Sequence, residues 1–183
     1  MAGYIFKILE GISSNYIISN NSDASVRDSG LNCGIVIKPS AGYSVDDEVA
    51  LITQAAQMGL VPSMFTLGFL YHEGAKGVKK DFEKSMEWLL KAIENEYAPA
   101  MSYLGFIYYR GDGVTVNKTK AIELWNKAMA LGDFISCFHL SLAYKRGDGV
   151  IQDEVIAEKL WLRYLELKER YEKEEQTKPD DEP

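Results

Sequence analysis

The chain has 183 residues, 46% of them hydrophobic, and a formal net charge of −7. This length suits one domain with a continuous core, and the acidic balance argues against nucleic acids and anionic membranes, which need clustered Lys and Arg. The two cysteines, Cys33 and Cys137, are too few and too far apart for a metal site or a disulfide framework. We therefore expect reduced thiols in a cytoplasmic protein.

The first 43 residues do not share the pattern of the rest of the chain. The apolar residues from Tyr4 to Ile12 are interrupted by Glu10, and this stretch is too short for a secretory leader or a membrane span. Two short apolar clusters, residues 16–18 and 35–37, flank a polar run at 19–30. We expect residues 1–43 to be an irregular segment that caps the helices, forms a disordered arm or folds back over a binding surface.

A strong helical pattern begins at Ser44. Ser44 is a good N-cap, and the acidic residues 46–48 favour the positive end of a helix dipole. Gly59 is expected to end this helix. We interpret residues 44–59 as a half repeat that contributes only the second helix of a pair.

From residue 60 the sequence repeats with a period of 36 residues, which is clearest in the Gly-Val pairs at 77–78, 113–114 and 149–150. Such a period predicts an array of stacked helix pairs. We assign the repeats to residues 60–97, 98–133 and 134–171, followed by an acidic tail at 172–183. The fold class is therefore all-α, with helix A and helix B expected at 63–73 and 82–95, 99–110 and 118–131, and 134–146 and 153–175.

Each repeat also encodes its own helix starts and close contacts. The cap-type residues Asp81, Asn117 and Asp153 precede the three B helices. Glycine in the middle of helix A, at Gly68 and Gly105, indicates close approach of another helix, and the third repeat has Ser141 there. We expect large helix B side chains to fill the space beside these small residues. They are Trp88, Leu124 and Leu160, and one residue further on Leu89, Trp125 and Trp161.

These residues resemble the Sel-one-like repeat (SLR) family, which is related to tetratricopeptide repeats. The resemblance covers residues 60–165 and is best in the second repeat, at Leu104-Gly105, Tyr108, Gly111, Gly113-Val114, Lys120-Ala121 and Lys127-Ala128. The first repeat has one inserted residue in its loop at 74–77, and the third has Ser141, Ile156 and Arg163 at family positions. The resemblance implies a right-handed α-solenoid that acts as a protein-binding adaptor or scaffold.

The resemblance also implies that helix A lines a concave face. The expected protein-binding residues share four recurring helix A positions, and they are Phe65, Phe69, His72, Ser102, Phe106, Tyr109, Arg110, Phe138, Leu142, Lys145 and Arg146. An aromatic floor with a basic edge suits a peptide with apolar anchors and some acidic residues. The alternative is that the phenylalanines are core residues and the polar side chains are solvated surface.

Signs of catalysis are weak. His72 and His139 have no converging ligands, so no metal site is expected. The Gly-Asp-Gly loops at 111–113 and 147–149 follow helices rather than strands and are not phosphate loops. We predict a non-enzyme without cofactors, which is a monomer or weak homodimer.

Two other functions remain open. One is an immunity or inhibitor protein that masks a toxin or enzyme with its acidic surface. The more remote one is membership in a cysteine-rich secreted subgroup that resembles penicillin-binding or β-lactamase-like proteins. Members of that subgroup carry a cysteine pair in each repeat, and this chain lacks those pairs.

Overall fold

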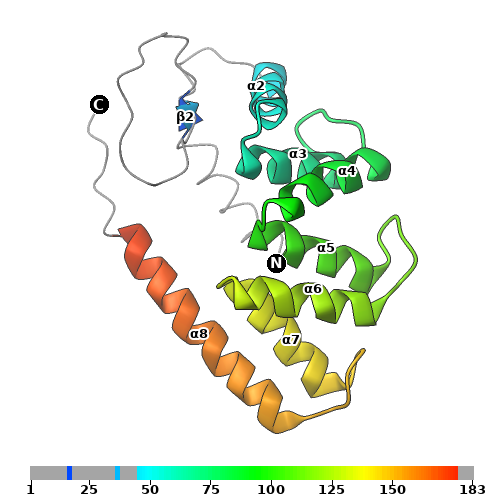
Figure 1. Cartoon of the computed structure of the whole chain (residues 1–183), viewed down its shortest axis with the longest axis vertical. Helices are drawn as coiled ribbons and strands as arrows, with labels where there is room; N and C mark the ends of the chain where they lie inside the picture. The colour runs from blue at the N-terminus through cyan, green and yellow to red at the C-terminus, as the bar shows by residue number, and fades with distance from the viewer. Residues whose placement is uncertain (1–15, 18–35, 38–44, 177–183) are drawn as a thin grey trace. The chain divides into compact units, whose positions relative to one another are not determined.

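The structure is a computed structural model that describes residues 16–17, 36–37 and 45–176. It contains a first compact unit that ends at Asn95 and a second that begins at Glu96. Between residues 45 and 176 the chain is helical, and the helix boundaries lie within two residues of those expected from the sequence (Figure 1). The helices are α2 (Val45–Gln57), α3 (Val61–Glu73), α4 (Phe82–Glu94), α5 (Ala98–Arg110), α6 (Lys118–Ala130), α7 (Phe134–Arg146) and α8 (Glu154–Gln176).

The first unit is built on the pair α3 and α4, with α2 packed against α3. Its core joins Ile52 and Ala56 of α2 to Leu67 and Leu70 of α3. This unit also holds β1 (Tyr16–Ile17) and β2 (Val36–Ile37), which pair in parallel. These strands fall in the two apolar clusters of the N-terminal segment. The expected roles of the rest of residues 1–43, and the predicted cap at Ser44, lie outside the described residues.

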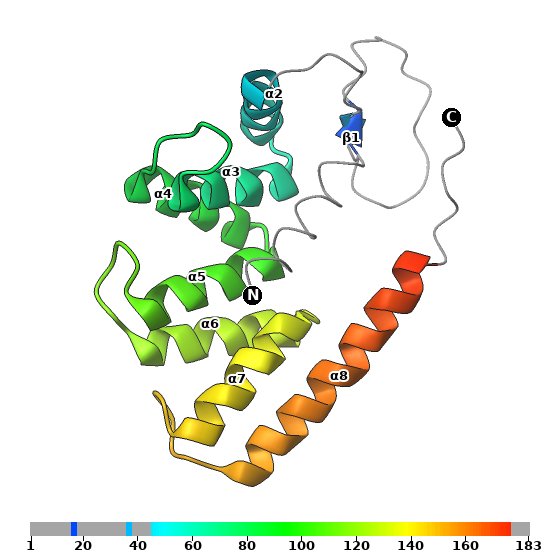
Figure 2. The same ribbon diagram turned by 180° about the vertical axis from the view of Figure 1, so that it is seen from behind.

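The second unit contains two helix pairs, α5 with α6 and α7 with α8, and α6 also packs on α7 (Figure 2). Residues of α5 and α7 that contact each other are separated by nearly the same number of residues along the chain. Ser136 Oγ lies 3.0 Å from Ser102 Oγ, and the rings of Phe106 and His139 are 5.9 Å apart. Because these pairs are separated by 34 and 33 residues, α5 and α7 run in the same direction, as equivalent helices of a repeat array should.

The three helix B caps are confirmed. Asp81 accepts a hydrogen bond from the Lys84 amide, Asn117 from the Lys120 amide and Asp153 from the Ile156 amide, at 2.9–3.0 Å. The A helices end at glycines in the left-handed conformation, which are Gly74, Gly111 and Gly147. The repeat thus carries the start and stop signals of its helices in its own sequence.

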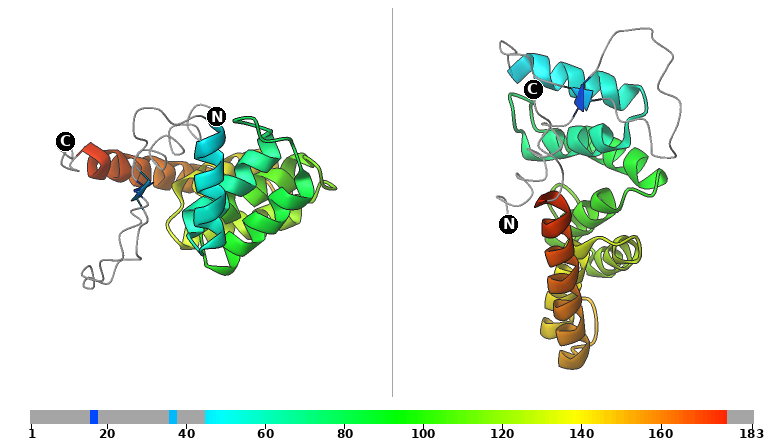
Figure 3. Two further views of the ribbon diagram at one scale, coloured as in Figure 1. Left: turned by 90° about the horizontal axis from the view of Figure 1, so that it is seen from above. Right: turned by 90° about the vertical axis from the view of Figure 1, so that its left-hand side faces the viewer.

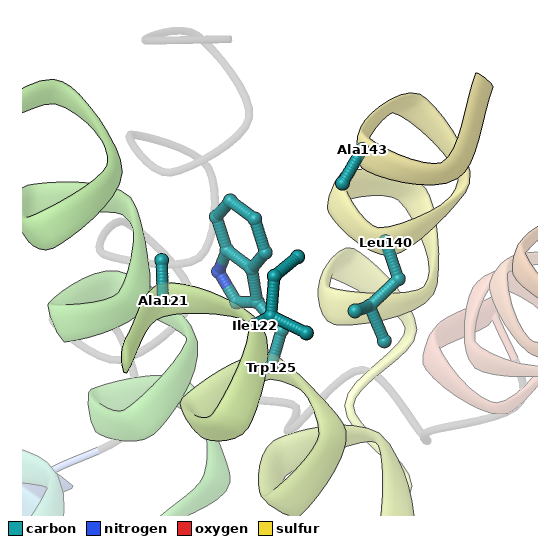
Figure 4. Packing of buried hydrophobic residues seen from close by; sticks show 5 residues of the cluster. All are labelled: Ala121, Ile122, Trp125, Leu140 and Ala143. Atoms are coloured by element: carbon teal, nitrogen blue, oxygen red, sulfur yellow. The ribbon is translucent and has the colours of Figure 1, made fainter. Parts of the chain in front are cut away.

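As expected, the mid-helix glycines Gly68 and Gly105 allow a helix B side chain to pack closely against helix A. A Cβ on Gly105 would lie 2.6 Å from Trp125 Nε1, and one on Gly68 would lie 2.9 Å from Leu89 Cγ. Trp125 is 1% exposed and donates a hydrogen bond from Nε1 to the Ser102 carbonyl at 3.0 Å. It packs with four other residues between α6 and α7, which are Ala121, Ile122, Leu140 and Ala143 (Figure 4).

The third repeat departs from this packing. We expected Trp161 to fill the space that a small residue leaves, but its side chain is 40% exposed, so this expectation was wrong. Ser141 stands where the other repeats have glycine, and its hydroxyl donates to the Ala157 carbonyl of α8 at 2.9 Å. The serine side chain occupies the space beside α7, and Trp161 instead contacts Phe138 and Tyr164.

Helix α8 is the longest helix, with 23 residues against 13 in α7 (Figure 3). Its covered side chains recur every three or four residues up to Leu167, and the Tyr171 ring, which is 39% exposed, contacts Phe134 at the start of α7. Its other apolar side chains, including Val155, Leu162 and Leu165, are exposed. None of the helices in the described part of the chain is long and apolar enough to cross a membrane.

Candidate functional site

The candidate residues of the first unit are mostly packed into α3. Phe65 is 4% exposed and His72 is 3% exposed, while Phe69 is half-buried. His72 Nδ1 lies 2.8 Å from a carboxylate oxygen of Glu73, and its ring meets the edge of Phe82 at 5.5 Å. Burial of Phe65 agrees with the alternative that the phenylalanines are core residues, and His72 is buried as well.

Ser102 is the buried candidate of the second unit. It is 5% exposed, its hydroxyl bonds with that of Ser136, and its carbonyl receives the Trp125 indole N–H. The side chain therefore joins α5 to α7 and contributes to packing rather than to a surface. This role could not be predicted from the repeat pattern, because the equivalent positions hold phenylalanine.

The other candidates of the second unit are carried by α5 and α7, which contact each other and run in the same direction. We call them the α5–α7 face: Phe106, Tyr109, Arg110, Phe138, Leu142, Lys145 and Arg146. The three basic residues are exposed and the four others half-buried. Arg110 Nε pairs with Asp112 at 3.0 Å, and its guanidinium carbon lies 5.3 Å from the Phe106 ring centroid. Because α5 and α7 each end at a basic residue, this face combines aromatic surface with positive charge.

Tyr109 belongs to a polar cluster that joins three segments of the second unit. Its hydroxyl donates to Asp148 Oδ2 at 2.6 Å, and Lys118 Nζ donates to Asp148 Oδ1 at 2.6 Å. The hydrogen bond from Lys118, followed by that from Tyr109, lowers the pKa of Asp148, and the bond to Asp148 raises the pKa of Lys118. Burial, followed by the bond to Asp148, raises the pKa of Tyr109. At neutral pH the cluster is thus a stable ion pair with a neutral phenol.

The residue of the first unit that is equivalent to Asp148 carries the opposite charge. Lys76 precedes the first Gly-Val pair as Asp148 precedes the third, and it pairs with Glu48 of α2. In both contacts the partner comes from the helix B that precedes the repeat, which is α2 for Glu48 and α6 for Lys118. Glu48 lies about one turn further from the start of its helix than Lys118 does. We call these two contacts the loop ion pairs.

The lysines of the α3–α4 loop were missed by the sequence reasoning. Lys76, Lys79 and Lys80 line a cleft of about 500 Å³ together with Lys84 of α4. Comparison of the repeats position by position would have revealed them. The positions of Lys79 and Lys80 hold Thr115 and Val116 in the second repeat, so these charges are not part of the repeat pattern.

The described residues offer little support for a metal site or for a reactive nucleophile. Among the described residues, no three His, Cys, Asp or Glu side chains are grouped as ligands for a metal ion. Cys137 is fully buried in α7, and burial raises the pKa of its thiol. A buried thiol with a raised pKa is a poor nucleophile. Cys33 lies outside the described residues.

Comparison with known proteins gives a consistent result. The sequence model of the Sel1 repeat matches residues 61–97, 98–133 and 135–163. The ERAD-associated E3 ubiquitin-protein ligase component HRD3A of Arabidopsis thaliana is 34% identical over 37% of this chain and 10% of its own length. Chitin synthase regulatory factor 3 of Schizosaccharomyces pombe is 29% identical over 56% of this chain and 11% of its own length. The chain thus spans about a tenth of these curated relatives.

Solved structures extend the similarity to the fold. A Sel1 repeat protein from Oxalobacter formigenes has a TM-score of 0.63 and 27% identity, over 68% of this chain and 50% of its own. The antigen c5321 of uropathogenic Escherichia coli, described as having an SLR fold, has a TM-score of 0.62 and 25% identity over 73% of this chain and 27% of its own. This likeness confirms the predicted class, an all-α solenoid of helix pairs.

Proposed function

Because the chain belongs to the Sel1 repeat family, we propose that it is a non-catalytic adaptor that binds a protein or peptide segment on the α5–α7 face. Extended helical-repeat surfaces are suited to this kind of recognition. The observation that carries the proposal is the placement of Arg110, Lys145 and Arg146 at the ends of two neighbouring helices, beside half-buried aromatic side chains. The buried free thiol of Cys137 supports the further proposal that the protein works in the cytoplasm.

The expected partner follows from the chemistry of this face. Arg110 and Arg146 favour carboxylates, and Phe138 and Leu142 offer apolar contact to anchor residues. Phe65, His72 and Ser102 are assigned to packing, because a partner reaches them only if the helices move apart. Phe69, which is half-buried on α3 of the first unit, stays a predicted contact residue outside the α5–α7 face.

The test is an affinity capture from the source organism with the full chain as bait. Arg110→Glu combined with Arg146→Glu should lose a protein that the wild type captures, with an unchanged circular dichroism spectrum. The matched control is Lys127→Glu with Lys159→Glu, which makes the same charge change at exposed positions of α6 and α8. Capture of the same protein by all three baits would remove the α5–α7 face from the interface.

Salt dependence distinguishes this function from an inhibitor that masks a basic site. An inhibitor guided by its net charge should lose association rate steeply as ionic strength rises. A surface anchored by aromatic side chains should lose much less. Association rates of the captured partner at low and high salt would decide between the two.

A further inference from the structure

The cleft in the first unit lies where the α3–α4 loop meets α2. Its volume is about 500 Å³, within the range of sites that hold small ligands or a few side chains. Val49 of α2, Tyr71 of α3 and Val78 of the loop give it an apolar wall. Each of these side chains is half-buried and so presents part of its surface to the cleft.

The rim of the cleft is positively charged on an otherwise acidic chain. One carboxylate, Asp81, lines the cleft against four lysines, which are Lys76, Lys79, Lys80 and Lys84. Asp81 is the cap of α4, and its bond to the Lys84 amide is the main reason that its pKa is lowered. The ionised carboxylate thus already accepts a hydrogen bond from the first turn of α4.

The rim lysines are neutralised only in part. Lys76 forms its ion pair with Glu48, and Lys84 Nζ lies 3.6 Å from Asp81 Oδ2 and 5.3 Å from the Tyr71 ring centroid. Lys80 Nζ lies 5.0 Å from the Phe82 ring centroid. Among the described side chains, the ion pairs at the cleft involve Lys76 and Lys84 and not Lys79, and both Lys79 and Lys80 are exposed. Two positive charges are therefore available to a ligand.

The other repeats show that the fold does not need these two charges. The second repeat has Thr115 and Val116 at the same positions, and the third has Ile151 and Gln152. The backbone is nevertheless alike, since the glycines of the three Gly-Val pairs have φ of 76°, 75° and 78°. A pair of lysines that one loop carries and two equivalent loops lack points to a role in binding.

We propose that this cleft binds an acidic peptide segment of a partner protein. Carboxylates of the peptide pair with Lys79 and Lys80, and an apolar side chain packs against Tyr71 and the two valines. A long nucleic acid is disfavoured, because the net charge of −7 repels its backbone beyond this small cleft. The cleft is in the first unit and the α5–α7 face is in the second, so this proposal stands independently of the proposed function.

The test uses the full chain and a fluorescein-labelled octapeptide of Asp and Glu around a central Leu pair, followed by fluorescence anisotropy. The variant is Lys79→Thr with Lys80→Val, which installs the second-repeat residues and so should fold. We expect saturable binding to the wild type and at least tenfold weaker binding to the variant, with equal melting temperatures. The same peptide with Asn and Gln in place of Asp and Glu should not bind.

The matched control is Lys120→Thr with Lys127→Val, which removes the same charge from exposed positions of the second unit. Its affinity for the peptide should stay within twofold of the wild type. Absence of saturable binding to the wild type would overturn the proposal, and so would equal weakening in the two double variants. Displacement of the peptide by an equal concentration of inorganic tripolyphosphate would also overturn it, because the cleft would then accept any polyanion.

Discussion

At the scale of single residues, the tight contact of Gly105 with Trp125 sets a limit on substitution. The indole is rigid and held by its hydrogen bond to Ser102, so it has no room to yield to a methyl group. Leu89, which lies against Gly68, has flexible bonds and is able to rotate away. The two glycines occupy equivalent positions but differ in the stiffness of their neighbours.

We therefore predict that Gly105→Ala lowers the free energy of unfolding by about 2 kcal/mol, despite the better helix propensity of alanine. Gly68→Ala should cost less, about 1 kcal/mol or below, because Leu89 adapts. Urea denaturation of both variants measures the difference. A Gly105→Ala variant as stable as the wild type would mean that Trp125 does not pack against α5 as described.

His139 provides a pH dependence. Its ring stacks on Trp125 at 4.8 Å, and burial lowers its pKa from 6.5 to about 4. The unfolded chain takes up the proton first as the pH falls, so His139 favours the folded state above pH 6.5 and this stability is lost toward pH 4. The full effect is about 3 kcal/mol. Asp133, whose pKa is raised by burial, works in the opposite direction in acid.

The prediction is that the wild type loses more stability between pH 7 and pH 4.5 than His139→Phe does. Phenylalanine keeps the stacking surface but takes up no proton, so the difference between the two curves isolates the histidine from Asp133. Urea denaturation at several pH values gives both curves. Parallel curves would show that His139 is protonated without difficulty in the folded protein.

At the scale of elements, helix starts and ends follow from local signals, and side-chain partners do not. The caps at Asp81, Asn117 and Asp153 and the stop at Gly111 are read from a few adjacent residues, so the helix boundaries could be predicted from the sequence. Burial of Ser102 and exposure of Trp161 depend on which residue a neighbouring helix places opposite them. The pattern predicts the same environment at both Trp125 and Trp161, and only the structure separates them.

The loop ion pair of the second unit allows a direct test at this scale. Lys118→Glu places two carboxylates together and should lower the free energy of unfolding, and adding Asp148→Lys should recover part of that loss by restoring opposite charges. The pair is partly exposed, so the coupling should be small and should weaken as salt is added. Denaturation of the two single variants and the double variant completes the cycle, and zero coupling at low salt would contradict it.

At the scale of the whole molecule, the repeat period predicted the fold class, whereas the candidate site was predicted only in part. Composition and spacing identified stacked helix pairs, because the 36-residue period is a property of the sequence itself. The lysines of the α3–α4 loop deviate from the repeat pattern, so the pattern did not predict them. Arg110 and Arg146 recur at one repeat position and are exposed, and their part in binding stays a prediction.

The exposed apolar face of α8 carries a prediction about self-association. Leu162 is 59% exposed and Leu165 is 43% exposed, so replacing both with glutamate should change the free energy of unfolding by less than about 0.5 kcal/mol. The same change should abolish any dimer that the wild type forms with rising concentration. Light scattering over a concentration series measures the mass. A large loss of stability would instead show that another part of the chain covers this face.

The opposite polarity of the two loop ion pairs has a consequence for repeat order. Repeats with nearly the same shape are able to stack on a wrong neighbour during folding, since their apolar faces are interchangeable. If α2 met the loop that carries Asp148, Glu48 would face a second carboxylate, and if α6 met Lys76, two ammonium groups would oppose each other. Each of these wrong pairings would therefore oppose like charges, so the correct order of repeats should be favoured slightly, and less so as salt is added.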